Sequence, residues 1–209
     1  MHDQTLGGFF DELASDAPAP GGGAAVGMSV ALGAALVAMV CRLTVGRKGF
    51  EDATSTIEAA LEQADALRHR GLALADQDAL AFGEVSAAYK LPRATDDEAA
   101  ARTGAIQSSL LAAATVPLDA ATAARDLAAL AGSLVGRSNP RVVSDLGVAA
   151  ANSRSAAVGA ALNVHVNTAL LRDREAAADL DRRIDALATE TVTEAERVER
   201  QVESMVVAS

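Results

Sequence analysis

Polar side chains recur along one face of residues 142–171, a segment that the sequence predicts to be helical. At about 100° per residue, five positions fall within one narrow arc of that helix: Asp145, Asn152, Gly159, Asn163 and Asn167. Carboxamides and a carboxylate on one stripe can bind a heterocycle that presents both donors and acceptors. A hydrogen-bonded seam between packed helices would show the same pattern, and the sequence alone favours neither interpretation.

Asp78 is the second candidate for chemistry. It lies one helical turn before Phe82, an apolar position, so we expect it to face inward. A carboxylate on the buried side of a helix tends to a raised pKa, which suits general acid–base catalysis. A solvated acid in an acidic protein is the alternative, and on these residues alone it is the commoner case.

Three consecutive glycines, Gly21 to Gly23, follow Pro18 and Pro20 and precede an apolar segment. Free backbone N–H groups at the start of a helix attract anions. The segment lacks the Lys-Ser or Lys-Thr pair of a nucleotide-binding P-loop. A tight turn beneath a crowded helix is the alternative explanation for the glycines.

The sequence gives little support for a metal site or for a surface that binds nucleic acid or a membrane. Cys41 is the only cysteine and the three histidines form no pair at ligand spacing, so we expect no metal site. The formal net charge of −10 argues against nucleic acid or an anionic membrane as a partner, because both require a basic face. A small anionic ligand, held by a few local Lys and Arg side chains, remains compatible with this charge.

The elements that would position these residues are all helical. No stretch alternates with period two, and half of the residues are hydrophobic while only 2% are aromatic, which favours tight helix packing. We expect an all-α fold, an elongated antiparallel bundle formed by residues 1–209 as one domain. The expected helices span about 4–14, 23–45, 51–91, 95–136, 142–171 and 175–206, with the fourth capped by Thr95 and Glu98 and kinked or split at Pro117.

One segment requires a membrane check. Residues 24–41 are uncharged over a length that could span a bilayer. They are mostly Ala and Gly, however, which contribute little to insertion, so we expect a core helix buried on all sides and no membrane. The opening residues Met1 to Asp3 lack the basic start of a signal peptide, and we expect a cytoplasmic protein.

Several collinear motifs, between about residues 9 and 173, resemble those of the cyclodeaminase/cyclohydrolase family. This family includes the cyclodeaminase half of formiminotransferase-cyclodeaminase and the stand-alone bacterial methenyltetrahydrofolate cyclohydrolases. The segments that carry the resemblance are Ala14–Ala25 with its Pro-Gly-Gly-Gly core, Met39–Lys48 (M-V-x-x-L-T-x-G-R-K), Asp78–Phe82 (D-x-x-A-F), Tyr89–Pro92, Val116–Leu118, Ser144–Ala149 and Leu162–Asn167.

The resemblance implies an all-α fold, a homodimer and a folate ligand that can be polyglutamylated. Family members hydrolyse the methenyl bridge of a tetrahydrofolate to give 10-formyltetrahydrofolate, or cyclise 5-formiminotetrahydrofolate with loss of ammonia. Neither reaction needs a metal, or any cofactor beyond the tetrahydrofolate-bound substrate.

The resemblance also assigns roles to residues. Asp78 would be the general acid–base, and the backbone N–H groups of Gly22 and Gly23 would contact a carboxylate or developing negative charge. The remaining roles are binding the pterin-side heterocycle, by Asp145, Asn163 and Asn167, and holding the glutamate tail, by Arg47 and Lys48.

Three functions then compete. The cyclohydrolase is favoured, because the chain carries no fused formiminotransferase. The cyclodeaminase, an ammonia-lyase, would work beside a separate formiminotransferase. The third possibility is a non-catalytic folate binder or a structural helical dimer.

Overall fold

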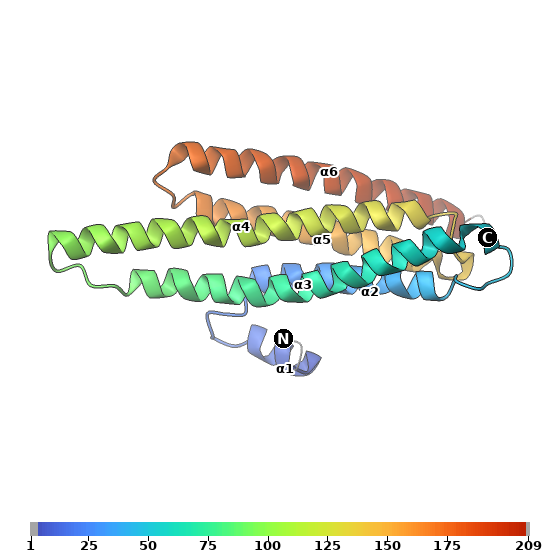
Figure 1. The fold of residues 1–209 in the computed structure, drawn as a ribbon, viewed down its shortest axis with the longest axis horizontal. Helices are drawn as coiled ribbons and strands as arrows, with labels where there is room; N and C mark the ends of the chain where they lie inside the picture. The colour runs from blue at the N-terminus through green and yellow to red at the C-terminus, as the bar shows by residue number, and fades with distance from the viewer. Residues whose placement is uncertain (1–3, 208–209) are drawn as a thin grey trace.

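The computed structural model describes residues 4–207, and within that range it contains six α-helices and no strand. Residues 1–3, from which the sequence predicts no signal peptide, lie outside the described range. The long helices run side by side along one axis, and α1 lies apart from them (Figure 1). The helices are α1 (Leu6–Leu13), α2 (Gly22–Arg42), α3 (Thr54–Tyr89), α4 (Asp96–Leu134), α5 (Val143–Thr168) and α6 (Arg174–Val207).

The all-α prediction is confirmed, with helix ends within about four residues of those expected. The capping box at the start of α4 is also present: Glu98 N–H donates to Thr95 Oγ1 and Thr95 N–H donates to Glu98 Oε2, each at 3.2 Å. The prediction that Pro117 splits this helix is wrong. Helix α4 continues past Pro117, which is buried. A proline removes one backbone donor, and the packing of α4 against α3, α5 and α6 compensates for that loss.

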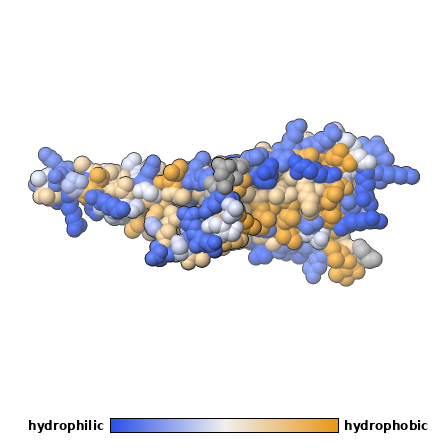
Figure 2. All heavy atoms as spheres, turned by 90° about the horizontal axis from the view of Figure 1, so that it is seen from below, coloured by the Kyte–Doolittle hydropathy of each residue, from blue (hydrophilic) through white to orange (hydrophobic). Residues whose placement is uncertain are grey.

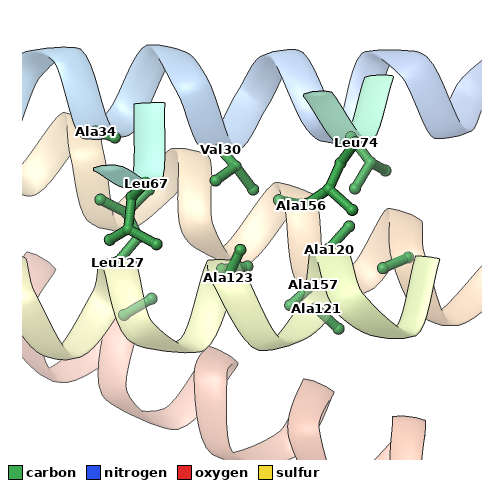
Figure 3. Packing of buried hydrophobic residues seen from close by; sticks show 14 of the residues in the cluster. Val30, Ala34, Leu67, Leu74, Ala120, Ala121, Ala123, Leu127, Ala156 and Ala157 are labelled. Atoms are coloured by element: carbon green, nitrogen blue, oxygen red, sulfur yellow. The ribbon is translucent and has the colours of Figure 1, made fainter. Parts of the chain in front are cut away.

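Helix α2 contacts three of the other long helices. It packs against α3, α4 and α5, and the core that these helices form consists mainly of Ala, Val and Leu. Figure 3 shows Val30, Leu74, Ala123 and Ala156 meeting from four different helices. Alanines at the contacts let the helix backbones approach closely, which explains how a core with few aromatic residues can be well filled.

The exposed side of α2 corrects one expectation. By length and composition α2 could cross a membrane, but 61% of its most apolar window is buried in the bundle, and core helices of soluble proteins meet the same criteria. Burial is not complete on all sides, however. Leu32 is 57% exposed and Met39 38% exposed, so one face of α2 lies open.

Helices α2 and α5 are antiparallel, and their register is fixed by contacts along their whole length. A Cβ placed on Gly22 would lie 3.8 Å from Asn163 Nδ2, and one on Gly33 would lie 3.3 Å from Asn152 Cβ. Beyond the end of α2, Asn139 N–H donates to Thr44 Oγ1 at 3.0 Å. The glycine-rich start of α2 therefore lies beside the C-terminal half of α5.

Helices α2 and α3 approach most closely at two glycines that face each other. A Cβ on Gly27 would lie 2.6 Å from the carbonyl oxygen of Gly71, and a Cβ on Gly71 would lie 2.7 Å from the same atom of Gly27. No side chain fits there without moving backbone, so this crossing requires glycine on both helices.

We therefore expect Gly71→Ala to lower the free energy of unfolding by about 1–3 kcal/mol, as overpacking does, although alanine favours the helix. Gly104→Ala on α4 is the control, because a Cβ at Gly104 meets nothing within 4 Å. That variant should gain up to about 1 kcal/mol from helix propensity. Urea denaturation of both variants tests this, and a Gly71→Ala protein as stable as Gly104→Ala would contradict the close approach.

Candidate functional site

A pocket of about 370 Å³ opens where the start of α2 meets α3, α4 and α5. Its polar lining consists of Gly21, Gly22, Gly23, Asp78, Asn163 and Asn167. The remaining lining residues are apolar: Pro18, Ala19, Ala81, Phe82, Val85, Leu110, Ala113, Val166 and Leu170. A small set of convergent polar groups in an apolar wall is the usual composition of a ligand site.

The carboxylate of Asp78 lies against the first turn of α2. Gly23 is buried there, and any Cβ at this position would overlap the Asp78 carboxylate. Burial raises the pKa of Asp78 above its ordinary value, and a hydrogen bond from the N–H of Ala24 offsets part of that rise. The expectation that Asp78 faces inward is confirmed, and its raised pKa is that of a group suited to proton transfer.

The first turn of α2 also presents free backbone donors. The first backbone bond of the helix runs from the N–H of Ala25 to the carbonyl of Gly21, so the N–H groups of Gly22 and Gly23 have no partner within the helix. Because both glycines line the pocket, these donors lie at its wall. They can bind an anion or a developing negative charge, as the sequence predicts.

The side-chain nitrogens of Asn163 and Asn167, which both line the pocket, are bound to their own helix. The Nδ2 of Asn163 donates to the carbonyl of Gly159 at 2.8 Å, and the Nδ2 of Asn167 donates to the carbonyl of Asn163 at 2.9 Å. A backbone carbonyl can only accept, so each amide nitrogen faces the helix and each Oδ1 remains for a ligand. Neither residue bonds across to another helix, so the seam interpretation does not fit these two side chains.

Three of the predicted binding residues are not brought to this pocket. Asp145 lies in the first turn of α5, 18 residues before Asn163, which is about 27 Å along the helix. Arg47 and Lys48 follow the C-terminal end of α2, a 21-residue helix about 30 Å long that has Gly22 at its other end. Within one chain these three residues do not line the pocket, because a shared helical face fixes an angle and not a distance along the axis, and their binding roles stay predictions.

The apolar wall was missed by the sequence interpretation. Leu110 and Ala113 come from α4, where no motif marks them, and in sequence they look like any core position. Val166 and Leu170 are 66% and 52% exposed, as are other large apolar residues of the bundle, so exposure does not mark them. Only the structure shows that they border a pocket.

A second hollow contains none of the predicted site residues. It is a more open groove of about 900 Å³ between α3 and α4, with Arg70 and Asp126 as its charged residues. Among residues 4–207 no cluster of three potential metal-binding His, Cys, Asp or Glu side chains occurs, and the expectation of a metal-free site stays a prediction.

Comparison with known proteins identifies the family of this chain. Residues 5–186 match the family model described as formiminotransferase-cyclodeaminase. The chain belongs to this family. Every polar residue that lines the pocket lies inside the matched range.

The chain matches some relatives over nearly their whole length and others over only a part. A protein of Methylorubrum extorquens named methenyltetrahydrofolate cyclohydrolase is 39% identical over 204 residues, which is 98% of either chain. Mouse formimidoyltransferase-cyclodeaminase is 35% identical over 193 residues, and this chain spans only 36% of its length. The crystal structure of formiminotetrahydrofolate cyclodeaminase from Thermotoga maritima superposes with a TM-score of 0.88 at 28% identity, over 98% of both chains.

The half-buried carboxylate of Asp78 should lower the stability of the fold at neutral pH. Because the pKa of Asp78 is raised in the fold, the folded chain binds more protons than the unfolded chain above about pH 4, so stability falls as pH rises through the folded pKa. Asp78→Asn should therefore unfold at a higher temperature than the wild type at pH 7, and this advantage should shrink toward pH 4.

The control for this comparison is Glu84→Gln, which removes the same charge from an exposed position of α3. The difference in unfolding temperature between Glu84→Gln and the wild type should not change with pH in the way expected for Asp78→Asn. Thermal unfolding of the three proteins between pH 4 and 7 measures both effects. An Asp78→Asn advantage that is constant over this range would contradict the raised pKa.

Proposed function

We propose that this chain is a methenyltetrahydrofolate cyclohydrolase, which hydrolyses 5,10-methenyltetrahydrofolate to 10-formyltetrahydrofolate. The observation that carries the proposal is the 39% identity to a cyclohydrolase over 98% of both chains. The pocket supports it independently, since it offers one half-buried carboxylate, free backbone donors and two carboxamide oxygens in an apolar wall.

In this proposal Asp78 handles both proton transfers. It takes a proton from the water that attacks the methenyl carbon between N5 and N10, which gives a neutral tetrahedral intermediate. It then returns that proton to N5 while the bond from carbon to N5 breaks, the remaining hydroxyl proton leaves to solvent, and the resulting formyl group stays on N10. A raised pKa suits a group that must act as base and then as acid, and such catalysis supplies about 10²–10⁴-fold in rate.

The other pocket residues would bind the pterin ring. The amino group and ring N–H groups of a tetrahydropterin are hydrogen-bond donors, and the Oδ1 atoms of Asn163 and Asn167 are the acceptors that the structure leaves for them. The N–H groups of Gly22 and Gly23 would contact the ring carbonyl or charge that develops at the reacting centre. About 370 Å³ lies near the lower end of ligand-site volumes, about 300–1,000 Å³. It therefore suits the bicyclic ring, with the benzoyl-glutamate portion extending outside.

Formiminotetrahydrofolate cyclodeaminase is the second candidate. The specific observation in its favour is the structural match to the Thermotoga maritima cyclodeaminase over 98% of both chains. The same carboxylate would protonate the departing ammonia after N10 attacks the formimino carbon. The higher identity to a cyclohydrolase places hydrolysis first.

We further propose a setting for this activity. Residues 1–209 form one domain in the cytoplasm, and two copies associate as a homodimer that acts without a metal. The match to both the cyclohydrolase and the cyclodeaminase over nearly their whole lengths supports one domain. The exposed apolar face of α2 supports association of copies.

Asp78→Asn tests the catalytic role. We expect turnover of 5,10-methenyltetrahydrofolate, followed by its absorbance, to fall by about 10²–10⁴-fold, while the substrate Kd changes little because Asn is isosteric. Loss of ammonia release from 5-formiminotetrahydrofolate in the same variant would identify the cyclodeaminase instead. A variant that retains substantial turnover of both folates would exclude Asp78 as the acid–base.

Gly23→Ala tests the contact between α2 and Asp78. Because the added methyl group would overlap the carboxylate, Asp78 must move and kcat should fall by at least about tenfold, as a misplaced catalytic group does. Gly21→Ala is the matched control, since its Cβ meets nothing within 4 Å and it should keep most of the activity. Equal kcat values in the two variants would contradict the importance of this contact.

A further inference from the structure

The turn between α5 and α6, residues 169–173, supplies part of the pocket. Leu170 in this turn lines the pocket, and its N–H donates to the carbonyl of Asn167, another lining residue, at 3.1 Å. Helices α3 and α4 extend beyond the turn (Figure 1), and Figure 2 shows the molecule narrowing toward the end that they form. The turn therefore lies beside α4 and not at the tip of the molecule.

The carboxamide of Gln107, on α4, holds this turn with two hydrogen bonds. Its Nε2 donates to the carbonyl of Leu170 at 3.2 Å, and its Oε1 accepts from the N–H of Arg172 at 2.6 Å. Neither backbone group has a partner within the turn itself, so one side chain with a donor and an acceptor satisfies both. Among residues 4–207 no other hydrogen bond joins α4 to the turn, and we call this pair of bonds the Gln107 clamp.

The other side of the turn is fixed by α6 and by the core. Leu171 is buried, and the guanidinium of Arg174 donates to the carbonyls of Thr168 and Leu171, each at 3.2 Å. The hydroxyl of Thr168 donates to Asp181 at 2.6 Å. None of these four residues lines the pocket. They fix where α5 ends, whereas the carbonyl of exposed Leu170, on the pocket side, bonds to Gln107.

Gln107 is also close to the part of the pocket that α4 forms. Leu110 follows it by three residues, which makes the two side chains neighbours on the helix surface. Leu110 and Ala113 line the pocket from α4, and Val166 and Leu170 line it from α5 and the turn. The Gln107 clamp therefore connects two parts of the apolar wall that come from segments far apart in the sequence.

We propose that Gln107 is a positioning residue for substrate binding: its clamp fixes the turn against α4 and so keeps Leu170 in place as the wall of the pocket. A wall that is ordered before the ligand arrives binds it more tightly than one that must be ordered on binding. Where the wall is in place for only a fraction of the molecules, the apparent Kd rises in inverse proportion to that fraction. That the ligand is a tetrahydrofolate rests on the proposed function, whereas the clamp does not.

Gln107→Met tests the proposal by steady-state kinetics. Methionine is unbranched, resembles glutamine in length and helix propensity, and can form neither bond of the clamp. We expect KM for 5,10-methenyltetrahydrofolate to rise by up to roughly tenfold, the largest factor that one such hydrogen bond usually contributes. The value of kcat should stay within about twofold, because the clamp touches neither Asp78 nor the first turn of α2 and acts on binding alone.

Gln201→Met is the matched control. Gln201 is an exposed carboxamide on α6 whose side chain bonds to Arg197 of the same helix at 2.8 Å, so both kinetic constants should stay at their wild-type values. Neither variant should unfold at a much lower temperature, because water can replace the lost bonds at exposed positions. A Gln107→Met protein with a wild-type KM would overturn the proposal, and a lowered unfolding temperature with that KM would show a structural role only.

A double-mutant cycle with Leu170→Ala tests whether Gln107 acts through Leu170. Leu170→Ala alone should raise KM, since it removes apolar surface from the pocket wall. If Gln107 acts by holding this side chain in place, its replacement should matter much less once the side chain has been truncated. The KM of Gln107→Met/Leu170→Ala should then lie close to that of Leu170→Ala. Effects on KM that multiply in the double variant would overturn the proposal.

Amide hydrogen exchange observes the clamp without any assay of activity. In protein with isotopically labelled arginine, NMR should show the N–H of Arg172 exchanging slowly in the wild type and in Gln201→Met. In Gln107→Met this N–H loses its acceptor, so its exchange should be at least about tenfold faster. Equal exchange rates in the three proteins would overturn the proposal. If the wild type turns over neither folate, the proposed function fails, and the exchange rates still decide whether Gln107 holds the turn.

Discussion

The contact between the Asp78 carboxylate and the bare first turn of α2 is the constraint on which the rest of the site depends. Gly23 leaves room for the carboxylate, and the N–H of Ala24 donates to it. The same helix pair reaches its closest approach one turn further along, where Gly27 meets Gly71 and Ala75. The glycine crossing thus sets the separation of α2 and α3, and that separation places Asp78 at the pocket wall.

This arrangement lowers the stability of the fold at neutral pH and gives the site a carboxylate suited to proton transfer. Burial of Asp78 disfavours its charged form, and the helix start offsets only part of that cost. The structure supplies the remaining polar groups without further buried charge: two carboxamides donate to their own helix and keep their oxygens free, and the first-turn N–H groups remain available. The pocket is thereby preorganised by backbone and by short side chains, which lose little entropy when a ligand binds.

Much of the fold could be predicted from the sequence, and part of the site. The helices follow from composition and from local signals such as the Thr95 and Glu98 capping box, which depend on neighbours in the chain. Asp78, Asn163 and the glycines were identified because motif and helical face agree. Asp145, Arg47 and Lys48 do not line this pocket within one chain, because a shared helical face does not fix the distance along the axis, and their roles stay predictions. Helix α4 continues through Pro117 because tertiary packing overrides a local breaker.

The pH dependence of kcat/KM for 5,10-methenyltetrahydrofolate tests the central claim most directly. If Asp78 must be ionised to activate water, the rate should fall toward acid pH with a midpoint above the ordinary Asp value of about 3.9. The same limb should be absent from the small residual activity of Asp78→Asn. A wild-type profile that stays flat down to pH 4, or an acid limb that persists unchanged in Asp78→Asn, would contradict the account.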